Sequence, residues 1–359
     1  MADSKQAPLD AAAAAKAAFA SVQDKPFPND IFTAPELRWA VIGCGGIANQ
    51  MAQSLALAGR KLTGVANRTL TKAQTFADQY GVEKVYDTIE DLYADPDIDA
   101  VYITTPHNTH ITYLRAALAA GKHVLCEKAI TLNSAELDEA RAIAAEHNVV
   151  LMDATTVLHM PLYQELRRRM DAGEFGRMNL AQLNFGSYKE YGDLTNRFYN
   201  RNLAGGAMLD IGVYALSVMR LFMASQPVEV VSLGNTCETG VDVAGGIVCR
   251  NAEQQLGVVS LTLHSKQPKR SVISFDNCYI EVNEYPRADH ATIVWTADGH
   301  REEVAAGTEA YALCYEMADL EQAVAGDDSK RELLDYASDV MELMTKLRVD
   351  WGVVYPEEE

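Results

Sequence analysis

The sequence predicts an α/β protein with two domains, and two observations lead to this prediction. Between Leu37 and Ala154, short apolar runs alternate with stretches of helical periodicity, a pattern that implies right-handed crossovers and a doubly wound parallel sheet. After Asp153, strand-like runs follow one another with few helices between them, which is typical of an α+β domain with a large, mostly antiparallel, open-faced sheet. The 359 residues are enough for two domains of ordinary size.

The first domain is predicted to span residues 36–155. Its predicted strands are short and apolar on both faces: Arg38–Gly43, Lys61–Asn67, Ala100–Thr104, His123–Glu127 and Val150–Ala154. The helices predicted between them are Ile47–Ala58, Thr71–Tyr80, Thr109–Ala119 and Ala135–His147.

The second domain is predicted to span residues 156–359. Pro161 suits the first turn of a helix that runs to about Ala172 and ends at Gly173. The predicted strands are Asn179–Tyr188, Val228–Asn235, Leu256–His264, Ser271–Phe275 and Thr292–Thr296, with a helix over Gly206–Met223 and a helical tail over Ala310–Leu347. An open sheet face needs a cover, so we expect a homodimer or homotetramer.

The charge balance and the cysteines exclude several functions. Against 31 Lys and Arg stand 50 Asp and Glu, a formal net charge of -19, which repels nucleic acid and anionic membrane surfaces. No apolar run approaches the roughly 20 residues that cross a bilayer, and the first ten residues do not resemble an export signal. The six cysteines form no CxxC pair and have no neighbouring histidine at metal-ligand spacing, so we expect reduced thiols, no metal and a cytoplasmic protein.

A glycine-rich turn directly follows the first predicted strand and opens the first predicted helix. It reads Gly43-Cys44-Gly45-Gly46-Ile47-Ala48. In this context the first glycine allows a tight turn, the second lets the backbone approach a pyrophosphate, and the alanine stands where helix and strand pack closely. The free N–H groups of the helix N-terminus then bind the phosphates. The first domain is therefore predicted to be a Rossmann-type dinucleotide-binding domain.

The end of the second strand bears on the choice of cofactor. It reads Ala66-Asn67-Arg68-Thr69, without the acidic residue that usually binds the ribose hydroxyls of NAD. Arg68, with Thr69 beside it, suits a 2′-phosphate, so NADP is the preferred cofactor. If Arg68 instead stacks on the adenine, either NADP or NAD is allowed.

Polar side chains also follow the fourth strand, in Thr104-Thr105-Pro106-His107-Asn108-Thr109-His110. Ligands of open α/β sheets bind at this carboxyl edge. We expect cofactor contacts from Thr105, Pro106, Asn108 and His110. Asn108 or Thr109 also suits the cap of the following helix.

Residues 1–35 form an N-terminal extension of different character. An alanine-rich stretch is followed by Lys25-Pro26-Phe27-Pro28, where the prolines prevent one continuous helix. We expect a short helix and an extended arm. The arm either wraps a neighbouring subunit or covers the cofactor, or it is a loosely packed tail.

Two further segments carry a family resemblance. With the glycine turn and the Pro106–His110 segment, they resemble the glucose-fructose oxidoreductase, inositol dehydrogenase and rhizopine-catabolism (Gfo/Idh/MocA) family: Gly121-Lys122-His123-Val124-Leu125-Cys126-Glu127-Lys128 and Gly205-Gly206-Ala207-Met208-Leu209-Asp210-Ile211-Gly212-Val213-Tyr214. The resemblance covers nearly the whole chain after Leu37. The Asp-x-Gly-x-Tyr pattern is similar to the subgroup of glucose-fructose oxidoreductase and dihydrodiol dehydrogenase, which also has a basic-aromatic pair like Arg197 and Phe198.

The chain departs from the family at two places. Ala129 follows Glu127-Lys128 where a proline is usual, which leaves the family's cis or rigid bend open but keeps the lysine. The segment Asp153–Pro161 contains Leu158-His159-Met160 where an arginine-aromatic pair is usual, so the family's substrate contacts there are not carried over.

The resemblance implies an oxidoreductase that moves a hydride between nicotinamide and a hydroxyl carbon of a sugar, polyol or cyclic alcohol. Such a transfer needs a group that takes the hydroxyl proton as the hydride leaves. Tyr214 is the candidate, and Lys128 is the cation expected to stabilise its ionised form, since free tyrosine titrates near pH ~10. Asp210, four residues before Tyr214 on the predicted helix, is expected to face the same cleft and to orient Lys128 or the substrate hydroxyl.

The remaining candidates have less specific roles. Glu127 is expected to make a structural or ribose hydrogen bond. The candidate substrate contacts are His159, Tyr188 and Arg197, together with Tyr199 and Arg201. Two alternative functions keep the same fold: a tightly held cofactor that is recycled within one turnover, or a non-catalytic dinucleotide-binding sensor. A methyltransferase is a more distant alternative, because its glycine-rich turn can look alike.

Overall fold

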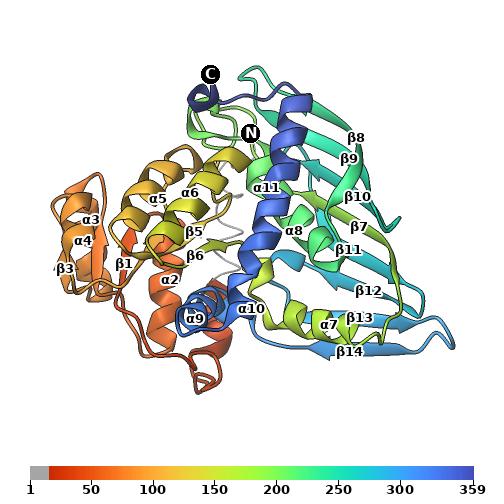
Figure 1. Cartoon of the computed structure of the whole chain (residues 1–359), viewed down its shortest axis with the longest axis horizontal. Coiled ribbons are helices and arrows are strands. Elements are labelled where there is room, and N and C mark those ends of the chain that lie inside the picture. Colours follow the sequence, from red (N-terminus) through yellow and green to blue (C-terminus); the bar gives the residue numbers. More distant parts are fainter. Residues whose placement is uncertain (1–15) are drawn as a thin grey trace, which may run out of the picture. The chain divides into compact units, whose positions relative to one another are not determined.

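The computed structural model describes residues 16–359, which form two compact units. The first unit contains the described residues up to Ala154 together with Ala310–Asp335. The second unit contains Thr155–Glu309 and Tyr336–Glu359. Residues 310–335, which the sequence groups with the second domain, therefore belong to the first unit. In Figure 1 their helix α9, in blue, lies beside α2, in orange.

The first unit confirms the predicted doubly wound parallel sheet. Its strand order is β3-β2-β1-β4-β5-β6, and β1 pairs in parallel with both β2 and β4. The strands are β1 (Trp39–Ile42), β2 (Gly64–Ala66), β3 (Lys84–Val85), β4 (Ala100–Ile103), β5 (His123–Glu127) and β6 (Leu151–Ala154). The helices are α2 (Gly46–Leu57), α3 (Leu70–Tyr80), α4 (Ile89–Ala94), α5 (His110–Ala119), α6 (Ser134–Glu146), α9 (Ala312–Val324) and α10 (Asp328–Arg331). The order reverses between β1 and β4, where such sheets bind ligands.

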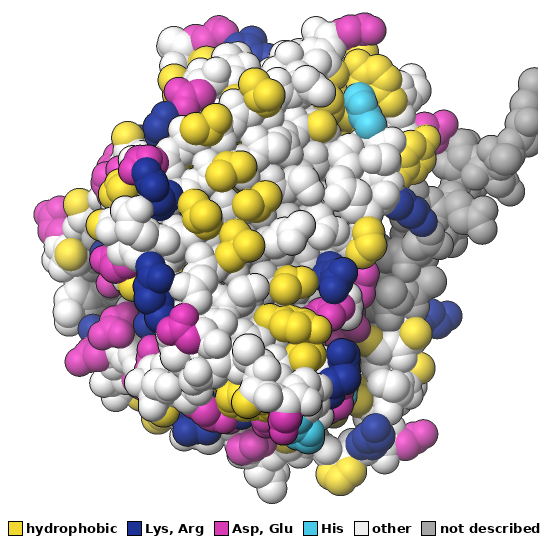
Figure 2. Space-filling view, turned by 90° about the vertical axis from the view of Figure 1, so that its right-hand side faces the viewer, with side chains coloured by type: hydrophobic (Ala, Val, Ile, Leu, Met, Phe, Trp, Pro, Cys, Tyr) yellow, Lys and Arg dark blue, Asp and Glu magenta, His cyan; other side chains and the backbone are white. Residues whose placement is uncertain are grey.

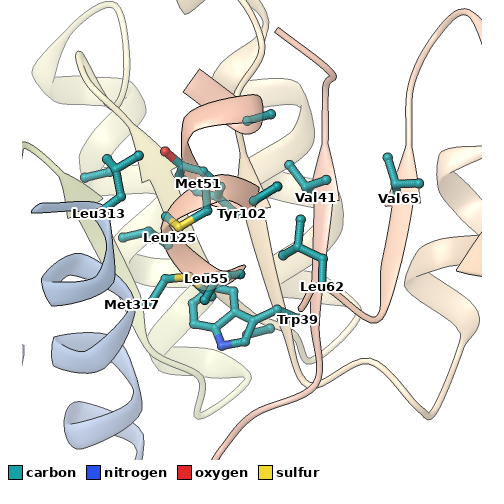
Figure 3. Close-up of a cluster of buried hydrophobic side chains, with 14 of the residues drawn as sticks. Trp39, Val41, Met51, Leu55, Leu62, Val65, Tyr102, Leu125, Leu313 and Met317 are labelled. Carbon is teal, nitrogen blue, oxygen red and sulfur yellow. The ribbon is translucent and has the colours of Figure 1, made fainter. Parts of the chain in front are cut away.

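Helix α9 belongs to the first unit because its apolar face packs there and one of its acidic side chains forms an ion pair there. Figure 3 shows Leu313 and Met317 in the same buried cluster as side chains of β1, α2 and β4. Glu321 is 1% exposed at its side chain, pairs with Arg60 at 2.6 Å and accepts a hydrogen bond from Trp39 Nε1 at 3.0 Å. Breaking such a buried pair would leave a charge without a partner, so it favours one docking position for the helix.

The described part of the N-terminal extension, residues 16–35, packs against the first unit of its own chain. Val22 is 4% exposed, and the ring of Phe27 lies 4.9 Å from that of Tyr311. The guanidinium of Arg60 lies 3.9 Å from the ring centre of Phe32, a cation–π distance. These residues are therefore packed rather than loose. Residues 16–22 are helical, as expected for the end of the alanine-rich stretch, and the part of that stretch before residue 16 lies outside the described residues.

The second unit confirms the predicted, mostly antiparallel sheet. Its strand order is β14-β13-β12-β11-β7-β10-β9-β8, in which β7 and β10 are a parallel pair. The strands are β7 (Met178–Gly186), β8 (Pro227–Thr236), β9 (Asp242–Asn251), β10 (Leu256–Thr262), β11 (Gln267–Phe275), β12 (Cys278–Asn283), β13 (His290–Trp295) and β14 (Arg301–Ala305). Helices α7 (Pro161–Asp171), α8 (Val213–Phe222) and α11 (Leu333–Asp350) lie on one face of this sheet (Figure 1).

The other face of this sheet is open, and hydrophobic side chains gather on it (Figure 2). Val231 and Leu233 of β8 are 75% and 83% exposed. Val248 of β9, which pairs with Val231, is 48% exposed. An exposed apolar group of this kind on a sheet marks an interaction surface.

Several elements were not predicted from the sequence: β3, α4, β9, β12 and β14. Strand β9 contains Gly245-Gly246, and β14 begins Arg301-Glu302-Glu303, residue types that disfavour strands in isolation. They become strands because their neighbours supply hydrogen-bonding partners along the whole ladder.

One helical stretch among the described residues, Arg201–Phe222, is long and apolar enough to cross a membrane by length and composition. The most apolar part of this stretch is 83% buried inside the structure, as in the core helix of a globular domain.

Candidate functional site

The glycine-rich turn joins β1 to α2 and forms an open cradle. Gly43 has φ +102°, and a Cβ there would lie 2.7 Å from Thr104 Oγ1. Around Gly45 and Gly46, by contrast, an added Cβ would meet nothing within 4 Å. Helix α2 begins at this turn without a side-chain cap hydrogen bond, so the N–H groups of its first turn are available to an anion. The cradle therefore fits the pyrophosphate of a dinucleotide.

The other members of this turn support the cradle by packing. Ala48 is fully buried where α2 meets the sheet, and Ile47 is half-buried. Thr104 donates from Oγ1 to the carbonyl of Ile42 at 3.1 Å, which fastens the end of β4 to the end of β1. The predicted requirement for small residues at Gly43 and Ala48 agrees with these close approaches.

The end of β2 presents basic groups. Arg68 and Thr69 are exposed, and Asn67 donates from its side-chain amide to the Thr69 carbonyl at 3.0 Å. Burial raises the pKa of the Cys44 thiol to about 11, and the positive charge of Lys72 opposes that rise. Lys72 thus lies near enough to the glycine turn to act on it electrostatically, which sequence reasoning missed because Lys72 belongs to the helix after the strand end.

The segment after β4 holds the end of β5 through two histidines. His107 Nε2 lies 3.0 Å from the Lys128 carbonyl. His110 is fully buried, with Nδ1 3.0 Å from the Ala129 carbonyl and Nε2 2.8 Å from the Thr105 carbonyl. Burial lowers the pKa of His110, which favours the neutral ring, and a neutral ring donates to one of these carbonyls at a time.

The predicted place of His110 beside the cofactor stays a prediction. Both ring nitrogens face backbone carbonyls, so the imidazole fixes the chain around the end of β5. His107 was not selected from the sequence, but its ring also contacts the chain at the end of β5. Its position three residues before His110 was the signal that could have identified it. Thr105 accepts a hydrogen bond from Thr109 Oγ1 at 2.9 Å, and Pro106 and Asn108 lie in the same short turn.

Lys128 follows the last residue of β5, as predicted. The carboxylate of Glu127 accepts hydrogen bonds from Tyr102 Oη and from the Lys128 backbone N–H, the latter at 3.3 Å. Glu127 therefore makes structural hydrogen bonds inside the first unit. The peptide bond between Lys128 and Ala129 is cis.

In the second unit, a glycine pair brings one loop against the start of a helix. A Cβ on Gly205 would lie 2.6 Å from the Arg197 carbonyl, and Gly206 donates from its N–H to the Phe198 carbonyl at 3.0 Å. Only glycine leaves room for this approach. The loop thereby places Arg197 Nη2 3.5 Å from Asp210 Oδ1, with the Arg197 guanidinium 4.1 Å from the Phe198 ring centre.

Asp210 lies in a π-helical turn, Met208–Gly212, that leads directly into α8. Such turns are rare and are frequently found at functional sites. Asp210 is 9% exposed, and Tyr214 is half-buried with its ring 6.1 Å from that of Phe185. The predicted continuous helix over Gly206–Met223 is thus a π turn followed by an α-helix.

The candidate substrate contacts have unequal exposure. Tyr188 is 46% exposed, and the Arg197 side chain is 60% exposed. His159 is 1% exposed, in the turn before α7. The described residues contain no group of three or more His, Cys, Asp or Glu arranged to hold a metal ion.

The parallel sheet with its glycine cradle and the α+β unit with its Asp-x-Gly-x-Tyr helix define a two-domain, nicotinamide-dependent type of oxidoreductase. Residues 37–155 match the model of the oxidoreductase family with an NAD-binding Rossmann fold, and residues 163–281 match the GFO/IDH/MocA C-terminal domain. The chain therefore belongs to the Gfo/Idh/MocA oxidoreductase family, which confirms the resemblance drawn from its motifs.

Characterised relatives and solved structures are similar over most of the chain. Trans-1,2-dihydrobenzene-1,2-diol dehydrogenase of Xenopus tropicalis is 31% identical over 242 residues, which cover 66% of this chain and 72% of that protein. The Xenopus laevis protein of the same name is 28% identical over 89% of this chain and 99% of its own length. A 3-ketoreductase from Actinomadura kijaniata, solved with NADP and TDP-benzene, superimposes with a TM-score of 0.74 at 25% identity, covering 88% of this chain and 98% of that one.

Proposed function

We propose that this protein is an NADP-preferring dehydrogenase or reductase of cyclic alcohols, sugars or polyols, with Tyr214 as the proton donor and acceptor. The observation that carries this proposal is the composition of α8. Eight of its ten side chains are buried, and the two others are Tyr214 and Arg220. Arg220 has a structural ion pair with Asp339 at 2.7 Å. Tyr214, one turn after Asp210, is therefore the side chain of this helix that is suited to chemistry.

The glycine cradle fits the dinucleotide, whose nicotinamide supplies the hydride acceptor or donor when bound. Tyr214 takes the proton from the substrate hydroxyl as the hydride leaves and returns it in the reverse direction. A phenol needs a nearby cation for this at neutral pH, and we assign that charge to Lys128. Asp210, held by Arg197, orients Lys128 or the substrate hydroxyl.

The proposed substrate class is supported by the side chains around Asp210 in the second unit and by the similar proteins. The side chains of Arg197 and Asp210 neutralise one another, while Tyr188 and Phe198 add aromatic surface. Such a mixture suits an uncharged ring that carries several hydroxyls better than a substrate recognised by fixed charge. Among the similar proteins, trans-1,2-dihydrobenzene-1,2-diol dehydrogenase is named for a ring that carries two hydroxyls, and one solved structure is a 3-ketoreductase.

The decisive experiment compares Tyr214→Phe with Tyr336→Phe on a panel of sugars and cyclic diols. Tyr336 of α11 is half-buried like Tyr214, lies away from the open sheet face, and serves as the matched control. Tyr214→Phe should lower kcat by about 10²–10⁴-fold, the usual contribution of a positioned acid or base, with an unchanged Kd for NADPH. Unchanged turnover in Tyr214→Phe would refute its role.

The wild-type protein distinguishes the alternative functions in the same assays. Nicotinamide absorbance that co-purifies with the protein would indicate a cofactor recycled within one turnover. Nucleotide binding without turnover of any alcohol, together with a protein partner that co-purifies, would indicate a sensor. A rise in Tm with S-adenosylmethionine but not with NADPH would indicate a methyltransferase.

The preference for NADP rests on the basic end of β2. Arg68 is exposed there, Lys72 follows on α3, and the segment between them contains no carboxylate that would repel a 2′-phosphate. The double variant Arg68→Ala/Lys72→Ala should weaken NADPH binding about 10-fold or more while changing NADH binding little, as fluorescence titration can measure. Equal losses for the two nucleotides would mean that these side chains contact shared parts of the cofactor.

We further propose that the protein is a cytoplasmic homodimer or homotetramer. All six cysteines lie in the described part of the chain, and each is a free thiol, which suits a reducing compartment. The apolar residues on the open sheet face suit a second copy of the same face, because a two-fold axis pairs identical surfaces.

A further inference from the structure

The last nine residues, Trp351–Glu359, form a segment that we call the C-terminal strap. It follows α11 and begins at Trp351, whose indole lies against a pair of glycines. A Cβ on Gly234 or Gly245 would lie 2.2 Å or 2.3 Å from this ring, and Trp351 Nε1 donates to Ser232 Oγ at 3.0 Å. The strap is thus anchored on β8 and β9 at its first residue.

Tyr355 then connects the strap to the glycine pair of the candidate site. Its side chain is fully buried, and its hydroxyl donates to the Gly205 carbonyl at 2.6 Å. Burial holds the pKa of this phenol well above its usual value, so the hydroxyl remains a donor at every physiological pH. The Tyr355 backbone N–H donates to Glu358 at 3.0 Å, and Glu358 pairs with the buried Arg348 at 2.8 Å.

A second buried side chain, that of Asp242, holds the turn that begins at Met208. Asp242 is fully buried, and its Oδ2 accepts a hydrogen bond from the Met208 N–H at 2.6 Å. A Cβ on Gly206 would lie 2.3 Å from Asp242 Oδ1. Tyr355 therefore holds Gly205 and Asp242 holds Met208, the first residue of the π turn that contains Asp210.

The loop that contains Arg197 is tied to the same strap. Arg201 donates from Nε to the Val354 carbonyl at 2.7 Å and forms an ion pair with Glu359. Both partners of the Arg197–Asp210 pair are thus connected to the strap, one through Arg201 and the other through Gly205.

We propose that the C-terminal strap is the positioning element of the candidate site and that Tyr355 is its main positioning residue. Through Gly205 it sets the start of the π turn and so the directions of Asp210 and Tyr214. The inference rests on the proposed function for its effect on turnover. A displacement of about 1 Å at a catalytic group can cost about 10²-fold in rate, so the loss of one hydroxyl far from the chemistry should be measurable in kcat.

The experiment compares Tyr355→Phe with Tyr285→Phe. Tyr285 is equally buried in the second unit, but its hydroxyl has no hydrogen-bond partner, so the control removes the same atom without breaking a bond. Tyr355→Phe should lower kcat about 10-fold or more and leave the Kd for NADPH unchanged. Its amides at residues 206–212 should exchange with solvent faster than those of the wild type, while Tyr285→Phe should match the wild type in both measurements.

Two results would overturn the proposal: a kcat for Tyr355→Phe within about twofold of the control, or unchanged exchange at residues 206–212. If the wild-type protein turns over no alcohol, the proposed function fails, and the exchange measurement alone then decides whether the strap holds the turn. Should Tyr355→Phe not fold, Arg201→Lys, which removes the bond to the Val354 carbonyl at a part-exposed position, takes its place with the same readouts.

Discussion

The guanidinium of Arg197 lies 3.5 Å from the carboxylate of Asp210, and the two side chains differ greatly in exposure, at 60% and 11%. The pair thus joins a solvated cation to a carboxylate that is almost buried. The Arg197 guanidinium also lies over the ring of Phe198. This contact limits the directions from which the guanidinium can approach Asp210. Asp210 is consequently held in one orientation by a group that could itself meet a substrate.

Replacing Arg197 by Met should reduce turnover without affecting nucleotide binding. The variant keeps an apolar stem but removes the charge that orients Asp210, so kcat/KM for the alcohol should fall about 10–100-fold. Arg168→Met is the matched control, because Arg168 forms an exposed ion pair with Glu165 on α7 at 2.8 Å. Steady-state kinetics and NADPH titration measure both effects, and equal kcat/KM values for the two variants would contradict the role of Arg197.

Alanine substitutions at two positions of the glycine turn should show which glycine is needed for the stability of the fold and which for cofactor binding. Gly43→Ala forces a side chain into a left-handed conformation and against Thr104, which should cost about 1–3 kcal/mol of unfolding free energy. Gly45 has φ -77° and open space around it, so Gly45→Ala should leave stability within about 0.5 kcal/mol but raise the Kd for NADPH about 10-fold or more. Thermal unfolding and nucleotide titration test this, and tight binding by Gly45→Ala would show that the cofactor does not approach this residue.

Asp242 should make stability depend on pH in a defined direction. Burial raises its pKa from 3.8 to about 6, while the hydrogen bond from the Met208 N–H works against that rise. The folded protein therefore binds this proton more tightly than the unfolded chain. The resulting stabilisation is complete below the unfolded value of 3.8 and is lost as the pH rises through about 6, an effect on the order of 3 kcal/mol.

The variant Asp242→Asn isolates this contribution because an amide does not titrate. Its unfolding free energy, relative to that of the wild type, should increase between about pH 4.5 and about pH 7. Urea unfolding at several pH values gives this difference directly. A difference that stays constant over the whole range would show that Asp242 does not titrate there.

The open sheet face should control the oligomeric state. Val231→Asp combined with Leu233→Asp places two charges among exposed apolar residues of β8, and an interface between two such faces would have to bury them. The double variant should have a lower mass than the wild type in sedimentation or light scattering, a monomer if the wild type is a dimer and a dimer or monomer if it is a tetramer. Val349→Asp, at a position 64% exposed on α11, is the control and should keep the wild-type mass. A double variant with unchanged mass would place the interface elsewhere.

Local patterns predicted the elements that carry the first half of the site. The turn between the first strand and the first helix and the strand His123–Glu127 lie where they were predicted, because buried parallel strands and the turns between them have distinct residue types. The exposed basic groups after β2 also lie where the sequence placed them. Whether Lys128 and Tyr214 act on one substrate remains a prediction for the variants to test.

Other features could not be predicted because they depend on distant partners. His110 was selected as a neighbour of the cofactor, and its contacts with the backbone carbonyls of Thr105 and Ala129 could not be predicted from the sequence. Asp210 and Tyr214 have helical spacing, but the π turn arises where Gly205 and Gly206 are held from outside. Strand β14 is rich in charge and is a strand because β13 pairs with it.

The sequence by itself determined the two folds, the dinucleotide cradle and the family, since these depend on periodicity and on residues within a few positions of one another. Only the tertiary structure decided that α9 belongs to the first unit and that Tyr355 holds Gly205, 150 positions earlier in the chain. The physical reason is that a buried hydrogen bond or ion pair gains its strength from the exclusion of water by packed neighbours. Those neighbours come together only when the whole chain has folded.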